Sequence, residues 1–223
     1  MKLFAYLLPA LLLCASAAAQ AQTPAQRAQD ATAVLAKFMQ SPDKALPQNM
    51  LNNAYAVAII PDVIKAGLVV GGRHGLGLVS IKQGNTWSDP SFISLTGGSI
   101  GFQIGVSSTD VVLIFRSKQG VDSIVYGKFT LGTDLAVAAG PVGRSVQAAT
   151  DAQLKAQIYS YSRTRGLFAG VALQGAVMRI DDAANAAAYG KAITAAQIFA
   201  GDASQVSKPI ADFNAALEEY TTP

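Results

Sequence analysis

The sequence has few of the residues on which metal-binding and disulfide-rich proteins depend. Its 223 residues include one cysteine, one histidine and one tryptophan, and only 14% are charged. The lone histidine, His74, has no second histidine and no H-E-x-x-H spacing beside it to complete a zinc site. The sequence therefore offers no metal site and no recognisable cofactor motif.

Long hydrophobic runs are also scarce, and the one at the start of the chain is short. Residues 3–13 are apolar, follow a single lysine and precede small residues that form A-x-A cleavage sites. The pattern predicts a signal peptide over 1–21 with cleavage after Ala21, or alternatively after Ala19. Leucines precede Cys14, so a lipoprotein anchor is not favoured. We expect a periplasmic or secreted protein with a cysteine-free mature chain.

The balance of charge is weakly basic, with 17 Lys and Arg against 14 Asp and Glu. A net charge of +3 permits contact with anionic surfaces without requiring it. There is no basic run and no RNP-like motif, so a nucleic-acid partner is not expected.

Helical signals stand at the two ends of the chain. Thr23 and Gln26 form a capping box before apolar residues at helical spacing, which predicts a helix over 24–40. The other expected helices cover 47–53, 117–126, 181–189, 194–200 and 209–220.

Between these ends the period changes to that of strands. The expected strands cover 55–60, 67–82, 87–95, 99–106, 110–116, 157–163 and 166–177. Pro61-Asp62 is expected to end the first strand, and turns are expected at 96–98 and 107–109. Segregated strands and helices predict an α+β fold with a mainly antiparallel, possibly barrel-like sheet, in one domain over 22–223.

The segment Phe129–Arg144 predicts two short strands joined by a Gly-Thr-Asp turn and ended by a Gly140-Pro141 corner. Its small residues let other backbone approach closely. We expect it to be a buried central segment with Asp134 and Arg144 at its ends.

Two glycine clusters, Gly71–Gly75 and Gly97–Gly101, do not precede helices in the way a nucleotide-binding loop requires. Bends or hairpins in a sheet are the simpler interpretation. Asp110 and Asp134 near strand ends could pair with His74 in a hydrolase, but aspartates at strand ends are ordinary turn residues, and that interpretation is preferred.

Single basic residues stand at the ends of apolar strands. If several converged on one rim they would bind phosphate groups; otherwise they form a solvated rim of unrelated charges. They are Lys65, Arg73, Arg116, Lys128, Arg144, Arg163, Arg165 and Arg179.

Four stretches in this order resemble the SYLF domain, also called the Ysc84-type or DUF500 domain. They are AVAIIPDVIKAGLVVGGRHGLGLV, WSDPSFISLTGGSIGFQIGVSSTDVVLIF, GKFTLGTDLAVAAGPVGR and YSYSRTRGLFAGVALQGAV, within about residues 53–200. The resemblance implies a non-enzymatic module that binds anionic phospholipid. Eukaryotic members are linked to phosphoinositides and to actin beside an SH3 domain, but no SH3-like segment occurs here.

With the predicted signal peptide, the resemblance implies a lipid-binding module of the bacterial envelope. The alternative is a structural or protein-interaction module of the periplasm with no lipid ligand. The basic residues that match the family pattern, and are therefore the expected lipid-binding residues, are Lys65, Arg73, Lys128, Arg144, Arg163 and Arg165.

Overall fold

The computed structural model describes most of the chain from Gln22 onward. The described residues are 22–40, 46–67, 70–100, 105–140, 155–164, 167–169, 173–190 and 192–221. The predicted signal peptide and two predicted lipid-binding residues, Arg144 and Arg165, lie outside them.

The helices form where the capping signals predict them. The Thr23 hydroxyl accepts the Gln26 N–H and the Gln26 side chain accepts the Thr23 N–H, so the predicted capping box is present. Thr194 and Gln197 repeat the same box. The helices are α2 (Pro24–Gln40), α3 (Gln48–Asn52), α4 (Lys118–Val125), α6 (Asp182–Tyr189), α7 (Ala195–Phe199) and α8 (Lys208–Thr221).

The middle of the chain forms one curled sheet with the order β6-β10-β4-β2-β1-β5-β8-β7, with β3 paired to β2 and β9 to β8. All pairs are antiparallel except β7 with β8. The α+β prediction is therefore confirmed. The strands are β1 (Ala56–Gly67), β2 (Val70–Gln83), β3 (Thr86–Trp87), β4 (Ser91–Ile100), β5 (Gly105–Phe115), β6 (Lys128–Thr130), β7 (Val137–Ala139), β8 (Ile158–Thr164), β9 (Leu167–Ala169) and β10 (Val177–Ile180).

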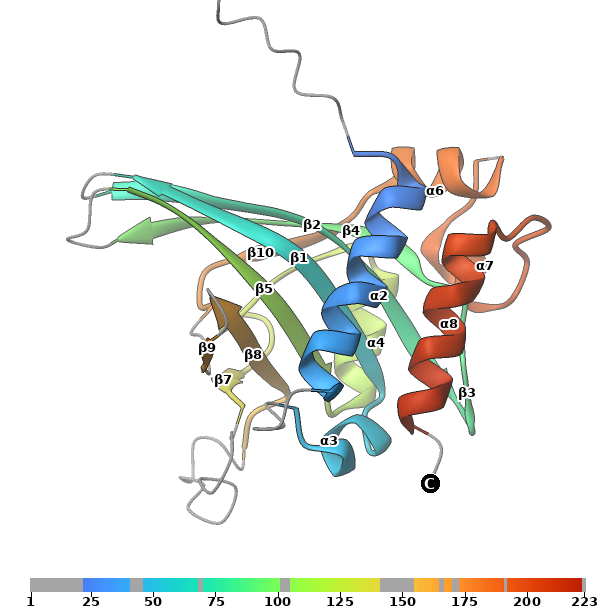
Figure 1. Cartoon of the computed structure of the whole chain (residues 1–223), viewed down its shortest axis with the longest axis horizontal. Coiled ribbons are helices and arrows are strands. Elements are labelled where there is room, and N and C mark those ends of the chain that lie inside the picture. Colours follow the sequence, from blue (N-terminus) through green and yellow to red (C-terminus); the bar gives the residue numbers. More distant parts are fainter. Residues whose placement is uncertain are drawn as a thin grey trace, which may run out of the picture.

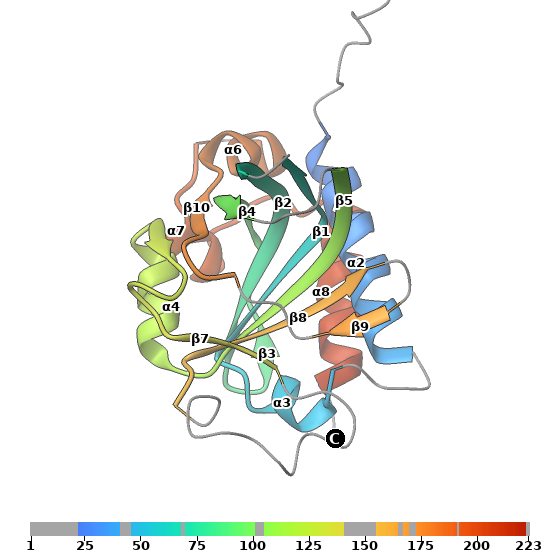
Figure 2. The same cartoon turned by 90° about the vertical axis from the view of Figure 1, so that its left-hand side faces the viewer.

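Helices cover both faces of the sheet. On one face, which we call the α2/α8 face, Leu35 of α2 and Phe213 of α8 pack with alternate strand residues such as Ile59. On the opposite face, the α4 face, Ile124 packs with the intervening residues such as Ile60. Figure 2 shows α2 and α8 on one side of the strands and α4 on the other.

Strand β1 does not stop at Pro61-Asp62, so the prediction that it ends there is wrong. Ile59 pairs with Leu78 and Ile64 with His74, which leaves one extra residue on β1. The same extra residue appears against β5. Asp62 has a positive φ of 45°, and this bulge lets the strand continue past the proline.

The turns predicted at 96–98 and 107–109 are also wrong, because β4 and β5 run straight through them. The predicted strand 99–106 is divided, since β4 ends at Ile100 and β5 begins at Gly105. Glycine serves close packing here: a Cβ on Gly97 would lie 3.0 Å from Ala176 Cα.

The segment Phe129–Arg144 is not central. Its first strand, β6, and its second, β7, lie at opposite edges of the sheet. Small residues allow a different close approach instead: a Cβ on Gly140 would lie 2.3 Å from Tyr161 Cζ. The strand predicted over 166–177 is likewise wrong, because a turn at 174–175 separates β9 from β10.

A buried ion pair fastens α2 to the C-terminal part of the chain. Arg27 Nη1 lies 2.7 Å from Asp181 Oδ2, with side chains 10% and 20% exposed. Asp181 also accepts the Ala184 N–H at the start of α6. The pair therefore joins two helices that are far apart in sequence.

We predict that Arg27→Met will lower the free energy of unfolding by about 2 kcal/mol, because it leaves the partly buried Asp181 carboxylate without its cation. Urea denaturation measures this change. The matched control is Lys208→Met, which breaks the exposed pair with Asp212 and should cost less than about 0.5 kcal/mol. Equal losses for the two variants would contradict the prediction.

Candidate functional site

The four central strands extend away from the helices at one end of the molecule (Figure 1). We call this end the sheet tip; it comprises residues 63–67 of β1, 70–75 of β2, 97–100 of β4 and 105–109 of β5. No described strand pairs with the outer side of β4 beyond Thr96 or of β5 before Thr109. The tip is thus a four-stranded projection whose two edges carry no further described strand.

The two faces of the tip differ in chemistry. Partners in adjacent strands point to the same face. Val63 packs in the core on the α4 face, so Lys65, two residues on, points to that face as well. Ile64 and Ala66 point to the α2/α8 face, beyond the reach of the helices that cover the rest of it.

Lys65 and Arg73 form the cationic centre of the α4 face of the tip. They lie directly opposite each other in the β1–β2 register. The Arg73 stem lies over Gly97 of β4, with its Cγ 3.5 Å from where a Cβ would stand. Burial lowers the pKa of the Arg73 guanidinium, which stays protonated because an arginine pKa is far above neutrality. Two predicted binding residues are therefore brought together.

The remaining predicted residues are elsewhere in the described structure. Lys128 lies at the β6 edge opposite Arg179 of β10. Arg163 of β8 lies opposite Asp110 of β5, whose carboxylate is 3.9 Å from Lys37 Nζ. The four described residues of the predicted set therefore lie in three separate places, with only Lys65 and Arg73 side by side.

Residues 63–67, 70–75, 97–100 and 105–109, which make up the tip, include no aspartate or glutamate. Between Asp62 and Asp110 the sequence has a single acidic residue, Asp89. Asp89 follows β3 at the opposite end of β2, where it accepts a hydrogen bond from Asn214 and where burial raises its pKa. Asp62 and Asp110 stand at the border of the tip, where the Ser108 hydroxyl donates to the Asp62 carboxylate on the α2/α8 face, while Lys65 and Arg73 stand on the opposite face.

Three apolar residues of the tip lie exposed on the α2/α8 face, and the sequence-based prediction missed them. Ile64 is 50% exposed, Val70 74% and Val106 71%. They alternate with polar or small residues in β-branched runs, which is the usual pattern of a half-buried strand. Only their exposed fractions show that no described helix covers them.

Nothing joins the residues of the hydrolase hypothesis. His74 is exposed beside Ile64 and Thr96, while Asp134 accepts the Thr130 N–H within its own turn. The five residues Gly97–Gly101 match G-x-S-x-G, but Ser99 lies within a strand and not at a strand-to-helix turn. The described residues contain no cluster of three or more His, Cys, Asp or Glu side chains.

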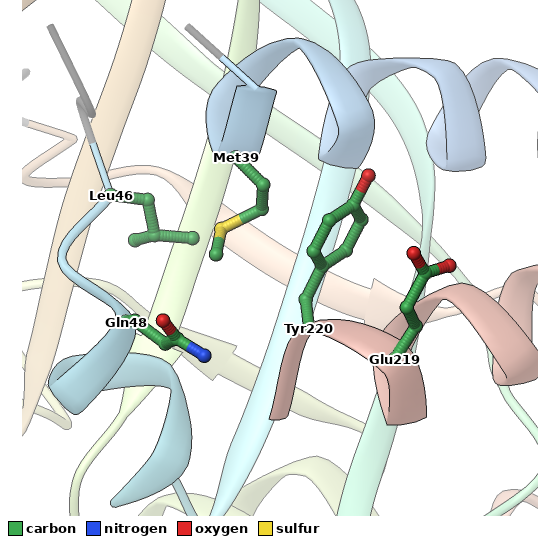
Figure 3. A pocket seen from close by; sticks show the side chains of 5 residues that line it. All are labelled: Met39, Leu46, Gln48, Glu219 and Tyr220. Atoms are coloured by element: carbon green, nitrogen blue, oxygen red, sulfur yellow. The ribbon is translucent and has the colours of Figure 1, made fainter. Parts of the chain in front are cut away.

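A small pocket lies between α2, α3 and α8, with Met39, Leu46, Gln48, Glu219 and Tyr220 around it (Figure 3). Its volume is about 130 Å³, well below the roughly 300 Å³ at which small-molecule sites begin. Tyr220 is held by Gln40. None of the described helices has the length and apolarity needed to cross a membrane.

A family model described as Ysc84, Las17-binding protein actin regulator, matches residues 96–220. The chain belongs to the Ysc84 family. This confirms the SYLF resemblance.

The curated relatives are much longer than the region that matches this chain. It is 40% identical to SH3 domain-containing protein PJ696.02 of Schizosaccharomyces pombe over 172 residues, 75% of this chain and 39% of that protein. It is 37% identical to LAS seventeen-binding protein 3 of Saccharomyces cerevisiae, over 77% of this chain and 39% of that protein. For SH3 domain-containing YSC84-like protein 1 of Homo sapiens the identity is 37%, over 72% and 47%.

The prediction of a periplasmic or secreted location is wrong. These Ysc84 relatives come from yeasts and a vertebrate, which points away from a compartment outside a bacterial cell membrane. The matched region spans less than half the length of each of the three relatives.

Like charges opposite each other in a sheet oppose folding. We therefore predict that Lys65→Glu, which places a carboxylate opposite Arg73, will raise the free energy of unfolding by up to about 1 kcal/mol. Denaturant titration measures it. Lys155→Glu, at an exposed position outside the strands, is the control and should change stability little; a destabilised Lys65→Glu would contradict the prediction.

Proposed function

We propose that this chain is a non-enzymatic Ysc84-family module that binds anionic phospholipid surfaces with its sheet tip. The observation that carries the proposal is the pair Lys65 and Arg73, two cations opposite each other on the α4 face of a projecting end. A single domain over 22–223 presents this tip.

The pair suits phosphate groups of lipids. An arginine offers a planar fork of donors to phosphate oxygens, and a lysine adds a mobile point charge. The mutual repulsion of the two cations is relieved when an anion lies between them, so the site gains most from a ligand that carries several negative charges in one plane, as a membrane surface does.

The position of the pair also favours a surface over a soluble ligand. Lys65 is exposed, and the tip projects away from the helices (Figure 1). A small phosphate compound would require an enclosing pocket to bind with useful affinity, whereas a membrane supplies many weak contacts at once.

We predict that the protein will sediment with vesicles containing phosphatidylserine, more at low salt than at high salt, because surface attraction is screened. Lys65→Glu and Arg73→Glu should each weaken binding about tenfold or more, since each nearby basic residue contributes about 1 kcal/mol and its reversal adds repulsion.

Lys128→Glu, at the β6 edge, is the matched control, because it changes the net charge by the same amount away from the tip. Equal weakening by Lys128→Glu would mean that net charge, and not the tip, attracts the vesicles. Failure of the unchanged protein to bind anionic vesicles would end the lipid proposal.

Protein binding is the second candidate, favoured by the description of the matching family model as a Las17-binding protein actin regulator. The tip is also the surface we would assign to such a partner, since it combines exposed apolar and cationic side chains.

In the protein-partner case we expect purified Las17 to bind the immobilised chain directly, and Val106→Asp to weaken that binding about tenfold by placing a charge in an apolar contact. Surface plasmon resonance measures it, with Val206→Asp, an exposed valine outside the tip, as the control. A Val106→Asp variant that binds Las17 as tightly as the control would refute this assignment.

A further inference from the structure

We propose that the sheet tip penetrates the membrane interface, with Val70 and Val106 reaching toward the acyl chains, Ile64 just behind them, and Lys65 and Arg73 holding the phosphate groups. This rests on the proposed lipid function and specifies how the tip meets the bilayer. Surface attraction alone would need only the cations; the apolar residues of the tip are the observation that goes beyond it.

Among the described residues, the three apolar side chains of the tip stand out by their exposure. Val70 and Val106 are more than two thirds exposed and Ile64 is half exposed, although each stands in a strand whose other end is buried. They come from three strands, β2, β5 and β1, and all point to the α2/α8 face. Exposed apolar side chains gathered at a projecting end are typical of a surface that enters an apolar phase.

The register sets the depth of each group. Val106 lies opposite Ala66, one residue further out than Lys65. Val70 is three residues further out than Arg73 along β2, or about 10 Å at the rise of a strand. Interfacial elements bury their apolar side about 5–10 Å into the boundary, so entry to this depth leaves the two cations at the level of the phosphates.

On β1 and β2, the α4 face of the tip carries no side chain at the pair of positions just outside the cations. The next outward position on that face is occupied by the paired glycines Gly67 and Gly71, and a Cβ on Gly71 would lie only 2.2 Å from the Ala66 carbonyl oxygen. With no side chain there, the Lys65 ammonium can extend along the strand toward the membrane surface, in the manner of lysines near membrane boundaries.

A bilayer fits these features better than a peptide does. A peptide bound along one edge strand would contact either β4 or β5, but Val70 lies on β2 and Ile64 on β1, inside both edges. A bilayer contacts the end of every strand at once, and an anionic one matches a tip with no acidic residue.

The test places a tryptophan at the tip. Val70→Trp keeps an apolar residue at an exposed position, and the native Trp87 is buried at the opposite end of the sheet, where its Nε1 donates to Thr221. We expect vesicles of phosphatidylserine and acyl-brominated phosphatidylcholine to reduce the added fluorescence about twofold or more, as for a ring at the acyl boundary. Val206→Trp is the matched control and should not be quenched.

A second variant separates penetration from attraction. Val70→Ser combined with Val106→Ser keeps every charge and should weaken vesicle binding about tenfold by removing two apolar anchors. Unlike the loss caused by Lys65→Glu, this loss should persist at high salt, where surface charges are screened.

The outcomes distinguish the two levels of the proposal. If vesicles bind the unchanged chain, Lys65→Glu weakens binding, and Val70→Trp is not quenched, penetration is overturned while the proposed function stands. If no vesicles bind, both fail. If Las17 and not vesicles changes the Val70→Trp emission, the tip belongs to a protein partner and penetration is overturned.

Discussion

The arrangement of the sheet tip depends on one extra residue in β1. Ile60 and Val63 both pack in the core on the α4 face, although residues three apart in a regular strand point to opposite faces. The bulge at Asp62 resets the alternation. It is held by two hydrogen bonds, from the Asp62 N–H to Asp110 and from the Ser108 hydroxyl to the Asp62 carboxylate. Every side chain of β1 beyond it, Lys65 included, takes its face from this bulge.

The same bulge separates a well-packed part of the sheet from a part with fewer packing contacts. On the body side, the strands carry helices on both faces, and the ion pair of Arg27 with Asp181 and the bond from Trp87 to Thr221 tie the terminal helices to the sheet. On the tip side, the strands are stabilised mainly by pairing with one another. A region with few buried apolar contacts is drawn from the low-stability end of a structure. The tip can expose apolar residues and like charges because packing of the helices on the rest of the sheet stabilises the fold.

The sequence predicts the class of fold, the capped helices and the strand character of the residues around Lys65 and Arg73, because each depends on local chemistry. It does not predict the bulge, since Pro61-Asp62 is an equally good signal for the end of a strand. It misplaces the turn at 96–98 because Gly97 serves close packing inside β4 against Ala176. It places Phe129–Arg144 at the centre because small buried residues occur at edges as well. Lys128 and Arg163 stand near strand ends in the sequence, as Lys65 does. Only the order of the strands in the sheet shows that they lie away from Lys65.

The glycines of the tip explain how cations and apolar side chains coexist on so thin a projection. Gly67 and Gly71 pack backbone against backbone, so this pair adds no side chain to the α4 face of the tip. Glycine clusters that resemble phosphate-binding loops in sequence therefore matter because they carry no side chain. They leave room for the Lys65 side chain on the α4 face, while valine and isoleucine occupy the opposite face. A lipid surface and a protein partner would both meet this two-faced end first. A lipid surface would contact the ends of all four strands, whereas a peptide would lie along one edge. Ile64 and Val70 stand on the two inner strands, which favours contact across all four.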